Sequence, residues 1–167
     1  MGTAIYSGSF DPITLGHLNI IKRARIIFPK IIVCVTVNAG KSPLFSLDER
    51  IEQVTQVISK FPNVEVAVCD TLIAEFARKH AAGVIIRGLR ALSDYEREFS
   101  MALVNKKLNP DLETFFLAAD EKYMYHSSSG VKELAHFGAD LSGWCPREII
   151  KPLQARMKQI TAGGIAR

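Results

Sequence analysis

Cysteine is scarce in this 167-residue chain, which holds only Cys34, Cys69 and Cys145. An odd number of cysteines at such wide spacing argues against a disulfide framework and against a zinc ligand set. We therefore expect a cytoplasmic protein with no metal held by its own side chains.

Long apolar runs and a basic leader are also lacking. The first six residues contain no lysine or arginine, and Lys and Pro interrupt every apolar stretch well before the ~18 residues of a membrane span. We expect neither secretion nor a membrane partner. The charge surplus is small, with 21 Lys and Arg against 17 Asp and Glu. A surplus of this size suits anionic small molecules, so we expect no nucleic-acid partner.

Two glycine-rich phosphate-binding strings are absent as well. The sequence contains neither Gly-x-Gly-x-x-Gly, which cradles the pyrophosphate of dinucleotides, nor Gly-x4-Gly-Lys-Ser/Thr, which cradles the phosphates in P-loop proteins. Hydride transfer and P-loop chemistry therefore lose support.

What the sequence does contain is a regular alternation of short β-branched runs with amphipathic segments. The runs are residues 4–6, 31–37, 64–68, 84–86 and 114–117. Strands this apolar, joined by helical crossovers, predict a parallel sheet that is covered on both faces. We predict an α/β fold with a doubly wound five-stranded parallel sheet of Rossmann-like type. Residues 1–160 would form its single domain and residues 161–167 a frayed tail.

Capping and periodicity give more detail on the helices. Ser46 with Glu49, and Ser93 with Glu96, have the spacing of a capping box, so we predict a helix start at each serine. Apolar residues at helical spacing predict two stripes that pack on the sheet. They are Ile20, Ala24, Ile27 and Phe28 in the first helix and Leu47, Ile51, Val54 and Ile58 in the second.

The loop after the first strand is built like a phosphate site. Ligands of open α/β sheets bind beyond the carboxyl ends of the strands. Here residues 7–17 are mostly small or hydroxylic and lead into a helix, whose N-terminus carries partial positive charge. Gly8 lets the backbone approach a ligand, Ser9 offers a hydroxyl and His17 falls in the first helical turn. Each feature taken alone is as typical of an ordinary turn or helix start.

Further anion-binding groups follow three other strands. Arg87 and Arg90 flank Gly88 at the end of the fourth strand, where guanidinium forks can grip phosphate oxygens. Residues 123–129 open a helix after the fifth strand, and Lys41 follows the second. Seen singly, these groups are surface arginines, an N-cap and a loop lysine. Together, anion-friendly loops at one edge of the sheet predict a polyphosphate ligand.

Two stretches carry a family resemblance. Residues 9–12, Ser-Phe-Asp-Pro, with residues 14–17, Thr-Leu-Gly-His, resemble the T/HxGH signature of the nucleotidyltransferase superfamily. Residues 86–90, Ile-Arg-Gly-Leu-Arg, followed by Asp94, Glu96, Glu98 and the serines at 127–129, are similar to the bacterial phosphopantetheine adenylyltransferases. The resemblance covers the chain from the first strand to about residue 160, and it implies the nucleotidyltransferase fold.

This resemblance also implies a reaction. Members transfer adenylate from ATP to 4'-phosphopantetheine, giving dephospho-coenzyme A and pyrophosphate in coenzyme A biosynthesis. Mg²⁺ would be bound mainly through the ATP phosphates, and the assembly would be a homohexamer. The residues implied for ATP are Ser9, Phe10, His17, Gly88, Leu89, Arg90, Glu98, Tyr123, Met124, Tyr125, His126, Ser127, Ser128 and Ser129, and those implied for phosphopantetheine are Ser9, Lys41, Ile73 and Arg87.

The chemistry implied needs no base and no covalent intermediate, because the attacking phosphate is already an anion. Catalysis then consists of positioning and charge stabilisation. We expect His17, Lys41 and Arg90 to be the catalytic donors to the charge that develops on the α-phosphate.

Three positions depart from the family pattern. An aromatic residue is common where Arg97 stands, an aliphatic one where His126 stands and a larger one where Gly130 stands. These departures affect packing around the nucleotide and leave the implied phosphate ligands intact.

Two other interpretations remain open from the sequence. One is a nucleotidyltransferase that acts on nicotinate mononucleotide or uses CTP, and the other is a nucleotide-binding module without turnover. The joint presence of His17, Lys41 and both arginines favours an enzyme.

Overall fold

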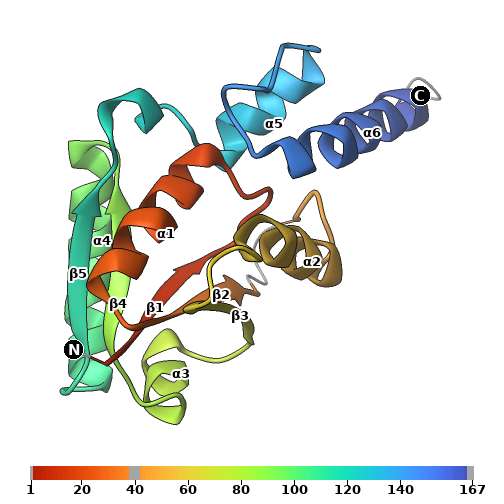
Figure 1. Ribbon diagram of the computed structural model, residues 1–167. Coiled ribbons are helices and arrows are strands. Elements are labelled where there is room, and N and C mark those ends of the chain that lie inside the picture. The colour runs from red at the N-terminus through yellow and green to blue at the C-terminus, as the bar shows by residue number, and fades with distance from the viewer. Residues whose placement is uncertain (1, 38–41, 165–167) are drawn as a thin grey trace.

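Five parallel strands form one sheet in the order β3-β2-β1-β4-β5. The computed structural model describes residues 2–37 and 42–164. The strands are β1 (Thr3–Gly8), β2 (Lys30–Thr36), β3 (Val64–Cys69), β4 (Ala82–Leu89) and β5 (Glu113–Ala118). The chain runs from the central β1 to one edge and then returns to fill the other edge (Figure 1). This order confirms the predicted doubly wound α/β fold.

Helices connect the strands and extend beyond the last one. They are α1 (Leu15–Ile27), α2 (Leu47–Ile58), α3 (Ile73–Lys79), α4 (Leu92–Leu108), α5 (Ser128–His136) and α6 (Arg147–Gly164), with a short 3-10 turn, η1, at Glu121–Tyr123. In Figure 1, α5 and α6 lie together beyond α1 and α2, away from β5. None of the helices within the described residues is long and apolar enough to span a bilayer.

Alternation along the strands builds a core on each face of the sheet. In β1, Ala4 and Tyr6 point into the larger core, which α1, α2, α5 and α6 complete, whereas Ile5 points into the smaller core under α3. Ile31 and Ile32 divide in the same way on β2. Because both faces are covered, the strands can be apolar throughout, as the sequence indicated.

Of the two predicted capping boxes, one is confirmed and the other is wrong. Ser46 and Glu49 form the predicted box at the start of α2: Ser46 Oγ accepts from Glu49 N at 3.2 Å, and Ser46 N donates to Glu49 Oε2 at 2.8 Å. At α4 the N-cap is Ala91, so the predicted start at Ser93 is wrong. Asp94 explains the difference, because its carboxylate accepts from Arg90 N at 3.1 Å and fixes the helix start two residues earlier.

Two further expectations differ from the structure. Ile27 is 41% exposed, because α1 ends there and only the extended conformation of Phe28 turns that ring back into the core. Of the tail expected to fray from residue 161, the described part, residues 161–164, belongs to α6. The other stripe residues are buried or half-buried as predicted.

Candidate active site

A cleft of about 830 Å³ opens at the carboxyl ends of the strands, where the topology predicts a ligand. It is lined by residues at or just beyond the end of every strand and by parts of α1, α3, α4 and α5. The sequence-predicted residues on its wall are Ser9, His17, Ile73, Arg87, Gly88, Arg90, Glu98, His126, Ser127, Ser128 and Ser129. Residues from four separate segments of the chain therefore meet in one cavity.

Other predicted residues do not line the cleft. Phe10 lies beneath the wall, 1% exposed, with its ring 5.1 Å from that of His17. Leu89, Tyr123, Met124 and Tyr125 are also absent from the lining. Tyr125 points outward and is 78% exposed. Lys41 lies outside the described residues.

His17 occupies the first turn of α1 and takes part in a capping box with Thr14. Thr14 N donates to His17 Nδ1 at 3.0 Å, and Thr14 Oγ1 donates to the carbonyl of His126 at 3.0 Å. Since Nδ1 accepts, the hydrogen of the neutral imidazole is on Nε2. We assign this tautomer from the hydrogen-bond network, and it leaves Nε2–H as a donor.

The electrostatic setting keeps this imidazole neutral. Burial, and secondly the positive charge of Arg90, lower the pKa of His17 to about 4. At neutral pH the ring is therefore an uncharged donor of fixed orientation.

Arg87 is held by two residues, Glu98 and Ser7, within the cleft wall. Its Nε lies 2.9 Å from Glu98 Oε2 on α4. Its Nη1 donates to Ser7 Oγ at 3.1 Å and to the Ser7 carbonyl at 3.3 Å. These contacts orient the guanidinium plane and leave Nη2 without a partner among the described residues.

Arg90, which precedes α4, is paired in a similar way with Asp94, one turn before Glu98 on that helix. Its Nε donates to Asp94 Oδ2 at 3.1 Å and its Nη2 to Asp94 Oδ1 at 3.2 Å, a two-pronged contact. Asp94 and Glu98 are four residues apart, so they share one face of α4. That face therefore places a carboxylate against each of the two arginines.

Two glycines allow segments of the site to approach closely. A Cβ on Gly16 would lie 3.2 Å from both Cβ and the carbonyl oxygen of His126. A Cβ on Gly88 would lie 3.0 Å from Ile20 Cγ1. The glycine of the T/HxGH stretch thus lets α1 start against the loop before α5, and Gly88 lets β4 lie close to α1.

Asp11 is a residue whose role the sequence did not indicate. Its buried carboxylate accepts from Leu44 N and Phe45 N, each at 2.9 Å, and lies 2.9 Å from Lys132 Nζ on α5. Burial raises its pKa, but these hydrogen bonds and the ammonium outweigh that effect and lower it. Asp11 therefore joins three segments around the cleft, and no local signal could reveal partners so far away in sequence.

The start of α5 is formed by the predicted serines. Ser127 is the N-cap and accepts from Gly130 N at 3.0 Å, whereas Ser128 Oγ donates to the carbonyl of Pro12 at 2.8 Å. Ser129 is exposed at the cleft. The serines thus fix the helix N-terminus against the loop after β1, with its positive end at the cleft wall.

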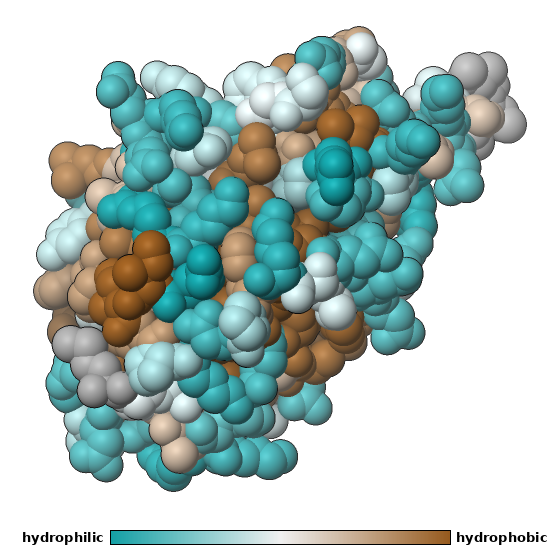
Figure 2. All heavy atoms as spheres, in the orientation of Figure 1, coloured by the Kyte–Doolittle hydropathy of each residue, from teal (hydrophilic) through white to brown (hydrophobic). Residues whose placement is uncertain are grey.

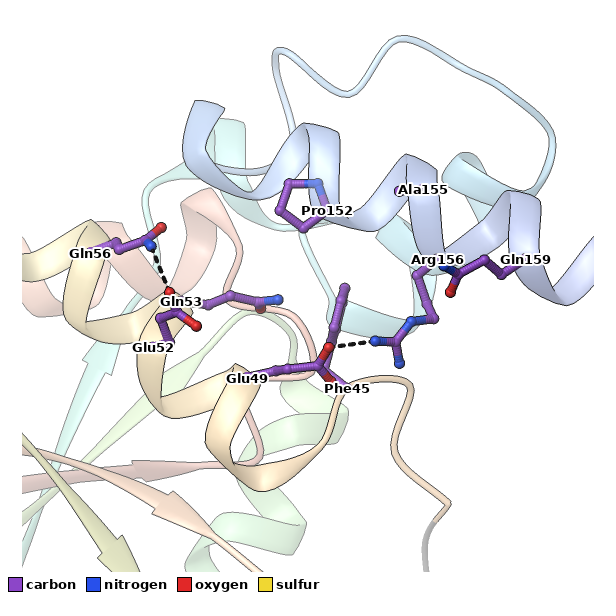
Figure 3. Close-up of a pocket in the computed structure, with 9 residues that line it drawn as sticks. All are labelled: Phe45, Glu49, Glu52, Gln53, Gln56, Pro152, Ala155, Arg156 and Gln159. Carbon is purple, nitrogen blue, oxygen red and sulfur yellow. Dashed lines mark hydrogen bonds and ion pairs between the residues drawn. The ribbon is translucent and has the colours of Figure 1, made fainter.

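A second, smaller groove of about 250 Å³ lies between α2 and α6. Figure 3 shows Arg156 reaching from α6 to Glu49 on α2, beside Phe45. Arg156 Nη2 lies 2.5 Å from Glu49 Oε1, and Nη1 donates to the Leu44 carbonyl at 2.6 Å. None of the predicted site residues lines this groove, and its arginine is already paired with Glu49, so the cleft is the better candidate.

The chain offers little to a resident metal ion. Across the described ranges, no group of three or more His, Cys, Asp or Glu side chains is arranged to hold one. Among the described residues, Glu98 is the one carboxylate on the cleft wall, and it is paired with Arg87. The donor set therefore does not fit a divalent cation bound by the protein alone.

The sequence is similar to a well-populated group of enzymes. The family model described as cytidylyltransferase-like matches residues 5–134. A phosphopantetheine adenylyltransferase from Caldanaerobacter subterraneus is 53% identical over 159 residues, 95% of this chain and 99% of the relative. One from Clostridium tetani is 50% identical over 153 residues, 92% of this chain and 96% of the relative.

Solved structures agree on the fold. A protein from Vibrio parahaemolyticus, described as a nicotinate-nucleotide adenylyltransferase, superposes with a TM-score of 0.69 at 16% identity, over 94% of this chain and 95% of that chain. At that identity the likeness concerns the fold alone. With the family model and the two relatives, the comparisons establish that this chain belongs to the phosphopantetheine adenylyltransferase family of cytidylyltransferase-like nucleotidyltransferases.

Proposed function

We propose that this chain transfers adenylate from ATP to 4'-phosphopantetheine, giving dephospho-coenzyme A and pyrophosphate. One observation carries the proposal: the loops after β1 and β4 and the start of α5 line a single cleft of about 830 Å³. Each of these segments offers donors suited to phosphate oxygens. The relatives' shared name supports this pair of substrates.

The reaction is a direct displacement at phosphorus. An oxygen of the pantetheine phosphate bonds to the α-phosphorus of ATP, and the bond from that phosphorus to the bridging oxygen of pyrophosphate breaks. The nucleophile is an anion and the leaving group departs as one, so no side chain has to move a proton. The protein's task is to align the two phosphates and to stabilise the charge between them.

His17 is the donor best placed for that charge. Its Nδ1 is occupied by Thr14 N, so Nε2–H is the group free to meet an α-phosphate oxygen. A neutral donor avoids the cost of a buried imidazolium beside Arg90. Arg90 supplies positive charge close by. We propose Lys41 as a third donor to the α-phosphate.

The arginine ion pairs prepare the site for phosphate. Glu98 and Ser7 fix Arg87 while its Nη2 stays available to the pantetheine phosphate. Asp94 accepts hydrogen bonds from both Nε and Nη2 of Arg90. A nucleotide phosphate must therefore share the guanidinium with that carboxylate or displace it. Ile73, the first residue of α3, offers an apolar contact on the cleft wall for the pantetheine arm.

We treat Mg²⁺ as part of the nucleotide substrate. The described carboxylates do not form a cage for it, whereas ATP phosphate oxygens are ligands that Mg²⁺ prefers. No step of the reaction is assigned to a protein-bound metal.

We further propose that six copies assemble. Within the described residues, α4 buries only Asn105, yet it exposes Leu92 by 80%, Leu103 by 58% and Val104 by 49%. Figure 2 shows hydrophobic side chains reaching the surface on the side of the molecule where α4 and β5 lie. Large apolar side chains this exposed favour burial of the helix against a neighbouring subunit.

We place the reaction in the cytoplasm. The cysteines Cys34, Cys69 and Cys145 are free and buried. Unpaired cysteines suit a reducing compartment.

Pyrophosphate release tests the function directly. The purified chain is incubated with ATP and Mg²⁺, and 4'-phosphopantetheine, pantetheine or nicotinate mononucleotide is added in turn. We expect release with 4'-phosphopantetheine alone, because the site is built for an anionic acceptor. Parallel reactions with CTP in place of ATP test the nucleotide. Release with nicotinate mononucleotide, or with CTP, would reassign the substrate, and tight nucleotide binding without release would indicate a binding module.

A further inference from the structure

Arg50, on the first turns of α2, is a buried cation to which the reaction described above gives no role. Arg50 is 5% exposed, and no carboxylate among the described residues lies within ion-pairing distance of its guanidinium. Its Nε also has no hydrogen-bond partner among those residues. A buried charge without a counter-ion is costly, so the fold keeps it where an anion or backbone oxygens compensate it.

The guanidinium of Arg50 joins the ends of two strands at the cleft. Nη1 donates to the Ser9 carbonyl at 2.7 Å and to the Thr36 carbonyl at 3.2 Å. Ser9 and Thr36 both line the cleft, the first just beyond β1 and the second at the end of β2. One nitrogen therefore sets the spacing between the β1 loop and β2.

The peptide that Arg50 holds lies next to a strained residue. Phe10 has a φ of 45°, in the left-handed region that side chains other than glycine seldom adopt. The Ser9 carbonyl belongs to the peptide bond that enters Phe10. The hydrogen bond from Arg50 thus helps to fix the conformation in which Ser9 faces the cleft.

We propose that Arg50 is a positioning residue of the transfer reaction, which holds the β1 loop against β2 and whose charge, paired with no carboxylate among the described residues, favours polyphosphate ligands in the cleft. The inference rests on the proposed function, because it assumes that the ligand is a nucleotide. Arg50 acts from behind the wall and through Ser9 and Thr36, without touching the substrate.

Two variants separate its charge from its hydrogen bonds. Arg50→Lys keeps a positive charge, whereas Arg50→Gln is neutral, and both side chains are shorter than arginine. Arg25→Lys is the matched control, because Arg25 is a half-buried arginine of α1 that stacks on Phe61 at 4.7 Å and does not line the cleft.

The binding experiment uses nucleotides of increasing charge. Dissociation constants of AMP, ADP and ATP are measured by calorimetry without divalent cations, at a temperature where each variant is folded. We expect Arg50→Gln to lose about two- to fivefold more affinity for each added negative charge, as a single charge at moderate distance predicts. Arg50→Lys should keep most of the wild-type gradient from AMP to ATP. Equal losses for all three nucleotides in Arg50→Gln would overturn the role of the charge.

The turnover number kcat tests the positioning role. We expect kcat to fall at least about tenfold in both Arg50 variants, because Ser9 and Thr36 lose their common donor. Arg25→Lys should keep kcat even if its melting temperature falls. An unchanged kcat in Arg50→Lys would overturn the positioning role, and that test stands even if Arg50→Gln does not fold. If the wild type binds none of the nucleotides, the proposed function fails instead, which is a distinguishable result.

Discussion

Arg87 and Glu98 form an ion pair inside the cleft, with 2.9 Å between Nε and Oε2. The family resemblance implies that Arg87 binds the acceptor and Glu98 the nucleotide. The two half-buried side chains, one on β4 and one on α4, are instead in direct contact. On the proposed function, the two substrates would meet at this shared pair of protein groups, as a reaction that joins them requires.

Arg87→Lys should raise the KM for 4'-phosphopantetheine about tenfold or more and change the KM for ATP little. Lysine cannot hold Glu98 and Ser7 and still present a further nitrogen to the phosphate. Steady-state kinetics with each substrate varied in turn measures the effect. Arg147→Lys is the control, because Arg147 has a 92% exposed side chain and its one ion-pair partner in the described part of the chain is its neighbour Glu148. Equal increases in both KM values would move Arg87 to a role shared by the two substrates.

His17→Ala should lower kcat by about 10²–10³, the usual cost of one preorganised donor, with little change in ATP affinity. His17→Asn separates donation from capping, because its amide oxygen can replace Nδ1 as the acceptor for Thr14 N. We expect His17→Asn to recover melting temperature but little of the lost kcat. Recovery of kcat in His17→Asn would mean that His17 acts as a cap alone.

Acid stability should report the pKa of His17. Its value of about 4 in the folded chain lies below the ordinary 6.5, so between these pH values the unfolded chain binds a proton that the folded chain does not. Stability from this residue is therefore complete above pH 6.5 and lost as the pH falls toward 4. Urea unfolding at pH 7.5 and pH 5 should show a smaller loss for His17→Asn than for the wild type. A loss of the same size in both would contradict the lowered pKa.

Asp11→Ala should destabilise the fold by about 2–4 kcal/mol, because two backbone N–H groups and Lys132 lose their acceptor. Lys132→Met should cost less, since the two N–H donors would still satisfy the carboxylate. Urea unfolding of both variants gives the comparison. If Lys132→Met proved the more damaging variant, the ion pair would matter more than the backbone hydrogen bonds.

Light scattering should give a mass of about six times the 18.5 kDa subunit. Leu103→Glu, on the exposed apolar surface of α4, should dissociate the assembly while circular dichroism stays that of a folded chain. Ile160→Glu is the control, because Ile160 is 50% exposed on α6. A monomer in the wild type at micromolar concentration would refute the hexamer.

The sequence itself determined the sheet, the sites of the loops and the first turn of α1. These features follow from local patterns: β-branched runs set the strands, apolar spacing sets the helices, and parallel connections bring the strand ends to one edge. That is why Ser9, His17 and Arg87 could be expected at one cleft before the fold was known. The Ser46–Glu49 box was predictable for the same reason, since both partners lie within one helical turn.

The tertiary structure alone decided which groups pair across the cleft. Asp11 meets Lys132 although 121 residues separate them, and Arg50 meets Ser9 from 41 residues away. Thr14 Oγ1 likewise donates to the carbonyl of His126, 112 residues further along the chain. Hydrogen bonds of this kind leave no periodic trace in a sequence, because their partners are set by how helices pack on the sheet rather than by local spacing.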